Sequence, residues 1–225
     1  MIVKSKGIVL GYMKYGDTSI IARIFTEEGG YGSYIVNSIR SQKSKKSIGH
    51  FQPFTILDLV LYVKETRDLQ RISEFKSHYP LHHIHQDLVK GSITLFLTEV
   101  FSKLLQSEQS PNPELFVFAE DAIKSFDQLT EGVGNFHLQF LLKLGPFLGY
   151  AIDDIDNLFS STDRLPPTNE NHEIMDALMK ESYGYEVKMT RDSRSLMLDS
   201  ILLYYQHHAH ISKPKSLEVL RSVLN

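Results

Sequence analysis

The fold is decided by the first thirty-nine residues, MIVKSKGIVLGYMKYGDTSIIARIFTEEGGYGSYIVNSI (1–39). Residues 2–12 are rich in β-branched and apolar side chains, and the turn-forming Tyr15-Gly16-Asp17 leads into a second apolar run that ends at residue 26. Glu27-Glu28-Gly29-Gly30 forms the next turn. Residues 31–39 then alternate between small or polar and apolar side chains, as in a strand with one solvent-exposed face. This pattern predicts an antiparallel meander of three strands.

Two more strands are expected after a basic loop. The run RSQKSKK (40–46) has no apolar periodicity and is typical of an exposed loop. Residues 53–63, PFTILDLVLYV, are strongly β-forming, and residues 69–75 form a possible fifth strand. Five short strands in about 75 residues suit a small closed barrel of the oligonucleotide-binding (OB) type.

A helical domain follows the barrel, because apolar residues recur at helical spacing from about residue 88 onward. Residues 150–172 hold aspartates, prolines and a polar stretch, and they predict an irregular loop or insertion. The fold class is therefore α+β, with a barrel over 1–79 and a helical domain over 80–225 that carries an irregular insertion over about 151–190. Its helices are expected over residues 88–105, 114–129, 135–148, 174–182, 195–208 and 216–224.

Composition limits the kinds of chemistry available. The 225 residues include no cysteine, which excludes disulfides, a thiolate zinc site and a cysteine nucleophile. The apolar run at the start is too short for a secretory or membrane-spanning segment, so a cytoplasmic protein is expected.

Charge is distributed unevenly along the chain. Residues 1–76 carry twelve Lys and Arg against seven acidic residues, a net charge of +5, whereas residues 77–225 carry -8. A polyanion is therefore expected to bind the N-terminal part.

Several stretches, in order, carry a family resemblance. They are GIVLGYMKYGDTSIIARIFTEEGG (7–30), IRSQKSKKS (39–47), FQPFTILDLVLY (51–62), LLKLGPFLGY (141–150) and KPKSLEVL (213–220). Together they resemble the RecO family of recombination mediators over nearly the whole chain. Many members of that family carry a four-cysteine zinc module in the region that corresponds to 151–190, and this chain has no cysteine there.

The resemblance implies a mediator that binds single- and double-stranded DNA, anneals complementary strands and helps a recombinase displace single-strand-binding protein (SSB). It implies neither catalysis nor a cofactor. It also implies two protein partners, RecR at the barrel and the acidic, phenylalanine-ended SSB tail at the helical domain.

The expected DNA-binding residues are cations of the barrel. The basic loop provides Arg40, Lys43, Lys45 and Lys46, where backbone phosphates can be reached. A second group from the strands could extend this surface: Lys4, Lys6, Lys14 and Arg23. Five aromatic residues could stack on bases, although aromatic residues in strands more often belong to the core: Tyr12, Tyr15, Tyr31, Tyr34 and Phe51.

The SSB tail requires an apolar pocket for its terminal phenylalanine beside a cation for its carboxylate. The expected cations adjoin predicted helices: Lys143, Arg191, Arg194 and Lys215.

An enzyme is the alternative from another class. A metal-dependent nuclease or phosphoesterase could use the histidines at 78, 82, 83 and 85 or at 207, 208 and 210, or Asp153, Asp154 and Asp156. Neither histidine set has the HExxH arrangement, and structural histidines and loop-capping aspartates are the preferred interpretation. A protein-only adaptor is the third possibility.

Overall fold

The computed structural model describes residues 1–41, 47–64, 66–107, 110–152, 156, 158 and 168–224. The chain forms two compact units, one of Met1–His85 with Thr98–Glu120 and the other of Gln86–Leu97 with Asp121–Asn225. Each unit is described by itself. The predicted boundary between residues 79 and 80 stays a prediction.

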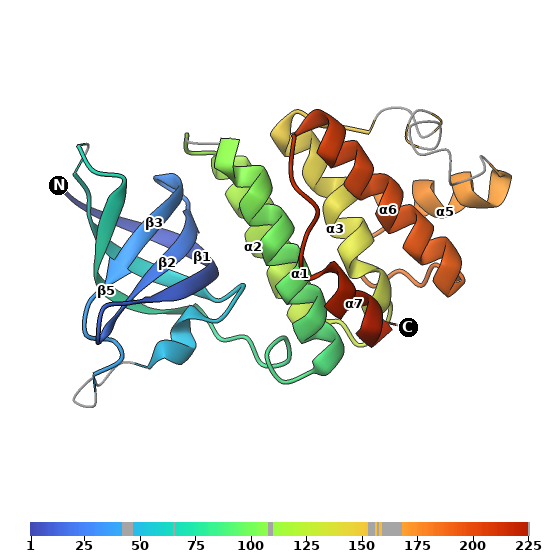
Figure 1. The fold of residues 1–225 in the computed structure, drawn as a ribbon. Coiled ribbons are helices and arrows are strands. Elements are labelled where there is room, and N and C mark those ends of the chain that lie inside the picture. The colour runs from blue at the N-terminus through green and yellow to red at the C-terminus, as the bar shows by residue number, and fades with distance from the viewer. Residues whose placement is uncertain are drawn as a thin grey trace. The chain divides into compact units, whose positions relative to one another are not determined.

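A closed five-stranded barrel forms most of the first unit (Figure 1). The strand order is β1-β2-β3-β5-β4, with β4 returning to β1, and β3 and β5 pair in parallel while the other pairs are antiparallel. This is the OB-type barrel that the sequence predicts. The strand bounds are β1 (Ile2–Tyr15), β2 (Ser19–Thr26), β3 (Gly30–Val36), β4 (Ile56–Tyr62) and β5 (Leu69–Tyr79).

Gly7 of β1 lies where the barrel interior leaves no room for a side chain. A Cβ atom at Gly7 would lie 2.6 Å from Cδ1 of Leu59 and 2.8 Å from Cγ2 of Ile24, closer than atoms of a packed core approach. Side chains along each strand point alternately into the barrel and outward, as in a half-buried sheet. Val9, Leu57 and Ile72 are part of the buried core inside the barrel.

Two helical segments pack within the same unit as the barrel. The second half of α1 (Leu88–Leu104) and the first half of α2 (Pro113–Gln128) lie in it. The ring of Phe25 on β2 lies with its centre 5.7 Å from that of Phe101 and 5.7 Å from that of Phe116. These contacts bury Phe25, which faces away from the barrel interior.

The second unit is helical, as predicted. It contains α3 (Phe136–Leu144), α5 (Asn169–Lys180), α6 (Arg191–His208) and α7 (Leu217–Leu224). Tyr205 is fully buried, and its hydroxyl donates to the Leu141 carbonyl at 2.6 Å, which fixes α6 against α3. The expected helix over 135–148 consists of α3 and the 3-10 helix Gly145–Leu148, and it stops at Gly149, where φ is +74°.

The expected insertion contains more regular structure than its sequence suggests. Helix α5 begins at Asn169 instead of residue 174, because the Thr168 side chain caps it by accepting from the Asn171 amide at 3.2 Å. Residues 153–155, 157 and 159–167 lie outside the described residues, and so do Asp153 and Asp154.

Candidate nucleic-acid interface

Arg23 lies in the middle of an uncovered row across the first three strands. The register places Gly11 of β1 on one side of Arg23 and Ser33 of β3 on the other. Because neither neighbour has a large side chain, the Arg23 guanidinium stays exposed. The next row along the same face contains Met13, which is 62% exposed, and the half-buried Ile21 and Ile35.

The parallel pairing of β3 with β5 adds a second cation to this face. Arg71 lies beside Ile35 in the register, and its guanidinium lies 5.8 Å from the ring centre of Tyr62, which is 44% exposed. We call the residues Gly11, Met13, Ile21, Arg23, Ser33, Ile35 and Arg71 the Arg23 face. Sequence patterns did not single out Arg71 or the apolar members of this face, because only the register shows which strands are neighbours.

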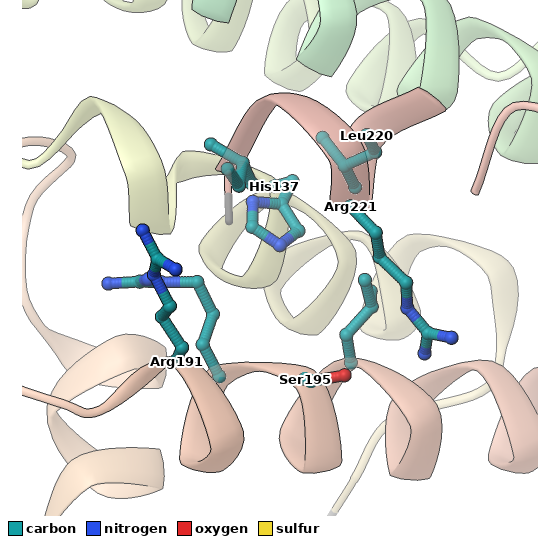
Figure 2. Close-up of a pocket in the computed structure, with 8 residues that line it drawn as sticks. His137, Arg191, Ser195, Leu220 and Arg221 are labelled. Carbon is teal, nitrogen blue, oxygen red and sulfur yellow. The ribbon is translucent and has the colours of Figure 1, made fainter. Parts of the chain in front are cut away.

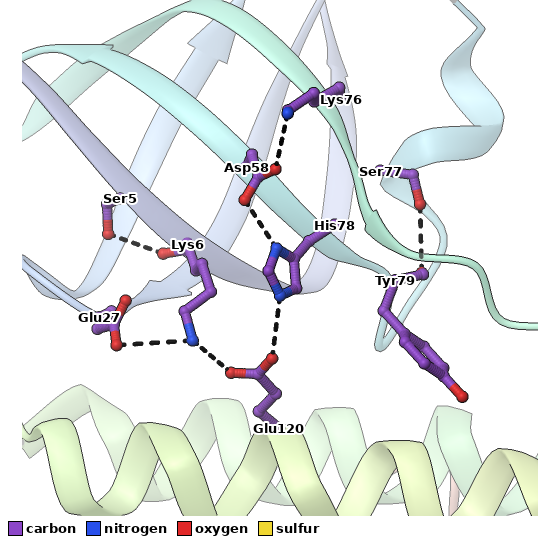
Figure 3. Close-up of polar contacts among 9 residues, drawn as sticks. All are labelled: Ser5, Lys6, Glu27, Asp58, Lys76, Ser77, His78, Tyr79 and Glu120. Carbon is purple, nitrogen blue, oxygen red and sulfur yellow. Dashed lines mark hydrogen bonds and ion pairs between the residues drawn. The ribbon is translucent and has the colours of Figure 1, made fainter.

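Lys6, a predicted DNA-binding residue, forms internal ion pairs (Figure 3). Its amine lies 2.6 Å from Oε2 of Glu120 and 3.6 Å from Oε1 of Glu27, and it lies over the Phe116 ring. Burial lowers the pKa of this amine, but the two carboxylates more than offset that effect and the pKa is raised. The charge of Lys6 is therefore neutralised within the protein.

The Glu120 carboxylate also contacts His78. Each ring nitrogen of His78 lies beside a carboxylate oxygen, with Nδ1 2.8 Å from Asp58 and Nε2 3.3 Å from Glu120 (Figure 3). Burial raises the pKa of Asp58, but hydrogen bonds from His78 and Lys76 outweigh it and hold the pKa below its usual range. His78 is thus tied to carboxylates on β4 and α2.

The other predicted cations have different surroundings. Arg40 donates from Nη1 to the carbonyls of Gly16 and Ser19 at 3.2 and 3.3 Å, so it braces the β1–β2 turn with part of its guanidinium. Lys4 is exposed beside Val60, and Lys14 is exposed at the end of β1 on the side of Ile20, which faces the barrel interior. Lys43, Lys45 and Lys46 lie outside the described residues.

The five aromatic candidates divide into core and surface. Tyr34 and Phe51 are buried in the barrel core, and the Tyr31 hydroxyl lies 3.1 Å from that of Ser102. Tyr12 and Tyr15 are 39% and 49% exposed. Only the last two of these candidates present most of a ring edge to solvent.

A cationic concavity lies in the helical unit at the start of α6 (Figure 2). Figure 2 shows His137 of α3 between α6, which carries Arg191 and Ser195, and α7, which carries Leu220 and Arg221. Arg194, Leu198 and Leu224 also line the concavity. We call it the α6 concavity.

Its polar groups are arranged around a buried imidazole. Asn135 accepts from Arg194 Nε at 3.0 Å, which leaves the end of the guanidinium for a ligand. Burial and the positive Arg194 lower the pKa of His137 to about 3, so this ring is neutral at ordinary pH. Its Nδ1 atom is buried and has no hydrogen-bond partner among the described residues.

Two predicted tail-binding cations lie elsewhere. The Lys143 amine donates to the Glu181 carbonyl and lies 5.0 Å from the ring centre of Tyr183, so it links α3 to the end of α5. Lys215 is exposed in the segment before α7 and does not line the α6 concavity. The structure therefore brings together Arg191 and Arg194 of the predicted set. Arg221 also lines the concavity, but its guanidinium pairs with Asp199 at 2.6 Å.

Among the described residues, no group of three or more His, Asp or Glu side chains could hold a metal ion. Asp156 pairs with His172 at 2.9 Å. No helix among the described residues is long and apolar enough to cross a membrane.

The topology and the Arg23 face define the class: the chain is an OB-barrel protein with a following helical domain. Comparison with known proteins makes this specific. Residues 1–80 match the family model described as "Recombination protein O N terminal", and residues 85–154 match "Recombination protein O C terminal".

Full-length relatives agree with the family models. Proteins named "DNA repair protein RecO" from Flavobacterium psychrophilum and Azobacteroides pseudotrichonymphae are 32% and 31% identical, each over the whole of both chains. A protein of the same name from Bacteroides fragilis is 31% identical, again over both full lengths. The chain belongs to the RecO family of DNA repair proteins.

Proposed function

We propose that this chain is a recombination mediator that binds single- and double-stranded DNA, anneals complementary strands and assists recombinase loading on SSB-coated DNA in the cytoplasm. The observation that carries the proposal is the Arg23 face, where the exposed Arg23 lies between Gly11 and Ser33 on the barrel surface. Such a face lets a phosphate reach the guanidinium while the bases meet half-exposed Ile21 and Ile35. Holding and aligning strands requires no covalent step.

The charge distribution supports the same assignment. The +5 charge of residues 1–76 includes Lys6, whose charge is neutralised. The exposed cations in the described part of these residues are Lys4, Lys14, Arg23, Lys64, Arg67, Arg71 and Lys76, of which Lys76 pairs with Asp58. The basic loop over 40–46 adds further cations next to the same strands in sequence. A nucleic-acid backbone is the partner that an excess of Lys and Arg on a small barrel fits.

The test is a titration of fluorescent single-stranded DNA with the purified protein, over a series of salt concentrations and without divalent metal. Arg23→Ala is expected to weaken binding about threefold to tenfold and to lower the salt slope by about 0.7, the value for one lost phosphate contact. Lys188→Ala, which removes an exposed cation of the helical unit, is the matched control. Equal affinities for the two variants would refute the Arg23 face, and metal-dependent cutting of the DNA would favour the nuclease alternative.

The SSB tail is proposed to bind the α6 concavity. Arg191 and Arg194 can meet the terminal carboxylate, while Leu198 and Leu224 supply apolar surface against which a phenylalanine ring would pack.

A synthetic acidic peptide that ends in phenylalanine tests this site. Arg191→Glu is expected to weaken binding at least tenfold, and Lys215→Glu, which changes an exposed lysine outside the lining, is expected to leave it within twofold. Amidation of the peptide terminus should reproduce the loss, because it removes the carboxylate. Equal effects of the two substitutions would show that only general charge matters.

RecR is proposed to bind the barrel beside the chain start. Met1, Ile2 and Tyr62 are 80%, 61% and 44% exposed, and Ile2 pairs with Tyr62 in the register of β1 and β4. Exposed apolar neighbours of this kind suit a protein partner. The substitution Ile2→Ser should abolish co-purification with RecR while DNA affinity stays within twofold.

A further inference from the structure

A second concavity lies on the barrel unit, away from the Arg23 face in sequence and register. Its polar lining consists of Ser47, His50, Gln52, Thr55, Ser77, Tyr79 and His85, and we call it the histidine concavity. The described residues that line it include no carboxylate. Hydroxyl and imidazole groups without an acid nearby form a donor set that suits an anion.

Hydrogen bonds fix the two imidazoles in orientations that make them sensitive to protonation. Nδ1 of His50 lies 3.0 Å from the Ser47 carbonyl, and Nε2 of His85 lies 2.8 Å from the Pro53 carbonyl. A carbonyl only accepts, so in each ring that nitrogen carries the hydrogen. The opposite nitrogen becomes a donor only when the ring gains a second proton, and each ring then presents a positive N–H.

Thr55 supplies a hydroxyl that the fold itself does not use. It is 8% exposed, and its Oγ1 atom has no hydrogen-bond partner among the described residues. The backbone holds Thr55 in place, because its carbonyl accepts from Val9 at 2.9 Å and the Phe54 amide donates to Val9 at 2.7 Å. Phe54 is fully buried with φ at +65°, a costly conformation for a bulky residue, so this local arrangement is fixed by its surroundings.

The carboxylates of the barrel unit lie on the other side of β5. Figure 3 shows Ser77 and Tyr79 directed away from the network in which His78 meets Asp58 and Glu120. Lys76 also belongs to that network, through Asp58 at 3.3 Å. The titratable side chains that line the histidine concavity are therefore His50, His85 and Tyr79 alone among the described residues.

We infer that the histidine concavity binds one backbone phosphate of a DNA strand, and that it does so in the protonated state of its histidines. The inference rests on the proposed DNA binding and extends it to a second contact point. Ser47 directly follows Lys46 in the chain, so the cations of residues 40–46 adjoin this concavity in sequence. The ligand is a phosphodiester of the strand, because a phosphate is the anion that a strand presents beside such cations.

The experiment compares three variants of the full chain with the same fluorescent single-stranded DNA at pH 6.0 and pH 8.0. His50→Gln removes one positive donor, Thr55→Val removes the unused hydroxyl at constant shape, and His207→Gln removes an exposed histidine of α6 as the matched control. Imidazole side chains gain their charge between about pH 8 and pH 5. At pH 6.0 we expect His50→Gln and Thr55→Val each to weaken binding threefold to tenfold, and at pH 8.0 we expect His50→Gln to have less than a twofold effect.

Stability and ligand controls make each outcome decisive. Thr55→Val should melt at or above the temperature of the wild-type chain, because it deletes a buried hydroxyl without a partner. The effect should be the same with oligonucleotides that have or lack a 5′ phosphate, and dependence on the 5′ phosphate would overturn the phosphodiester assignment. Wild-type binding with no change in His50→Gln and Thr55→Val would overturn the histidine concavity alone, whereas the absence of wild-type binding would overturn the proposed function.

Discussion

Glu120→Gln should destabilise the barrel unit by about 2 kcal/mol. The side chain of Glu120 is 6% exposed and accepts from Lys6 at 2.6 Å and from His78 at 3.3 Å. Hydrogen bonds that involve a charged group contribute about 1.5 to 3 kcal/mol, and glutamine keeps the volume and one acceptor oxygen. In the variant, Lys6 retains its ion pair with Glu27 at 3.6 Å. The expected loss of unfolding free energy therefore lies in the lower half of that range.

Thermal unfolding followed by far-ultraviolet circular dichroism measures this loss, since the chain has no tryptophan. A loss of about 2 kcal/mol corresponds to a decrease in Tm of about 6 °C for a chain of this size. Asp176→Asn is the matched control, because Asp176 lies at the same 2.6 Å from Lys180 but the two side chains are 48% and 72% exposed. That surface pair should contribute less than about 0.5 kcal/mol. Equal changes in Tm for the two variants would refute the argument that burial makes the Glu120 network strong.

Three further outcomes are expected. Asp58 has a lowered pKa, so its contribution to stability is present above its unfolded pKa of about 4 and is lost as the pH falls below it; Asp58→Asn should flatten the acid limb of Tm measured between pH 6 and pH 2. Gly7→Ala should lower Tm by several degrees or prevent folding, because the new methyl group would lie 2.6 Å from Leu59; an unchanged Tm would show that the barrel closes less tightly than the structure indicates. Tyr205→Phe should cost about 1 kcal/mol through the lost bond to the Leu141 carbonyl, and a chemical denaturation midpoint equal to that of the wild type would contradict this.

The sequence alone predicted the barrel well because strand signals are local. Apolar alternation and the Gly-containing turns lie within residues 1–39, and the structure confirms three consecutive antiparallel strands there. The start of α5 was placed five residues too late, since polar helix residues such as Asn169 and Asn171 carry no apolar period. The Thr168 cap that begins this helix was the available signal.

The site was less predictable because it depends on contacts between distant residues. Lys6 and Arg23 are the same kind of signal in sequence, a cation within a strand. Only the fold shows that Lys6 meets Glu120, 114 residues away, while Arg23 lies between Gly11 and Ser33. Likewise, Arg221 and His137 reach the α6 concavity from helices that are far apart in the chain. Nothing in the sequence was a reason to select Thr55, since only the structure shows that its buried hydroxyl has no hydrogen-bond partner among the described residues.

The separation of charge along the chain explains how the two proposed anionic partners can bind at different places. The part of the chain after residue 76 carries -8, so it repels a polyanion as a whole while Arg191 and Arg194 make one small cationic site within it. A single carboxylate at the end of a peptide is small enough to use that site, because its other contact is the apolar lining formed by leucines. A DNA strand spreads its charge over many phosphates and gains most where cations are repeated along a surface, as they are over residues 1–76. Two anionic partners can therefore be bound by one chain without competing, and added DNA should leave the affinity for the acidic peptide unchanged at moderate salt.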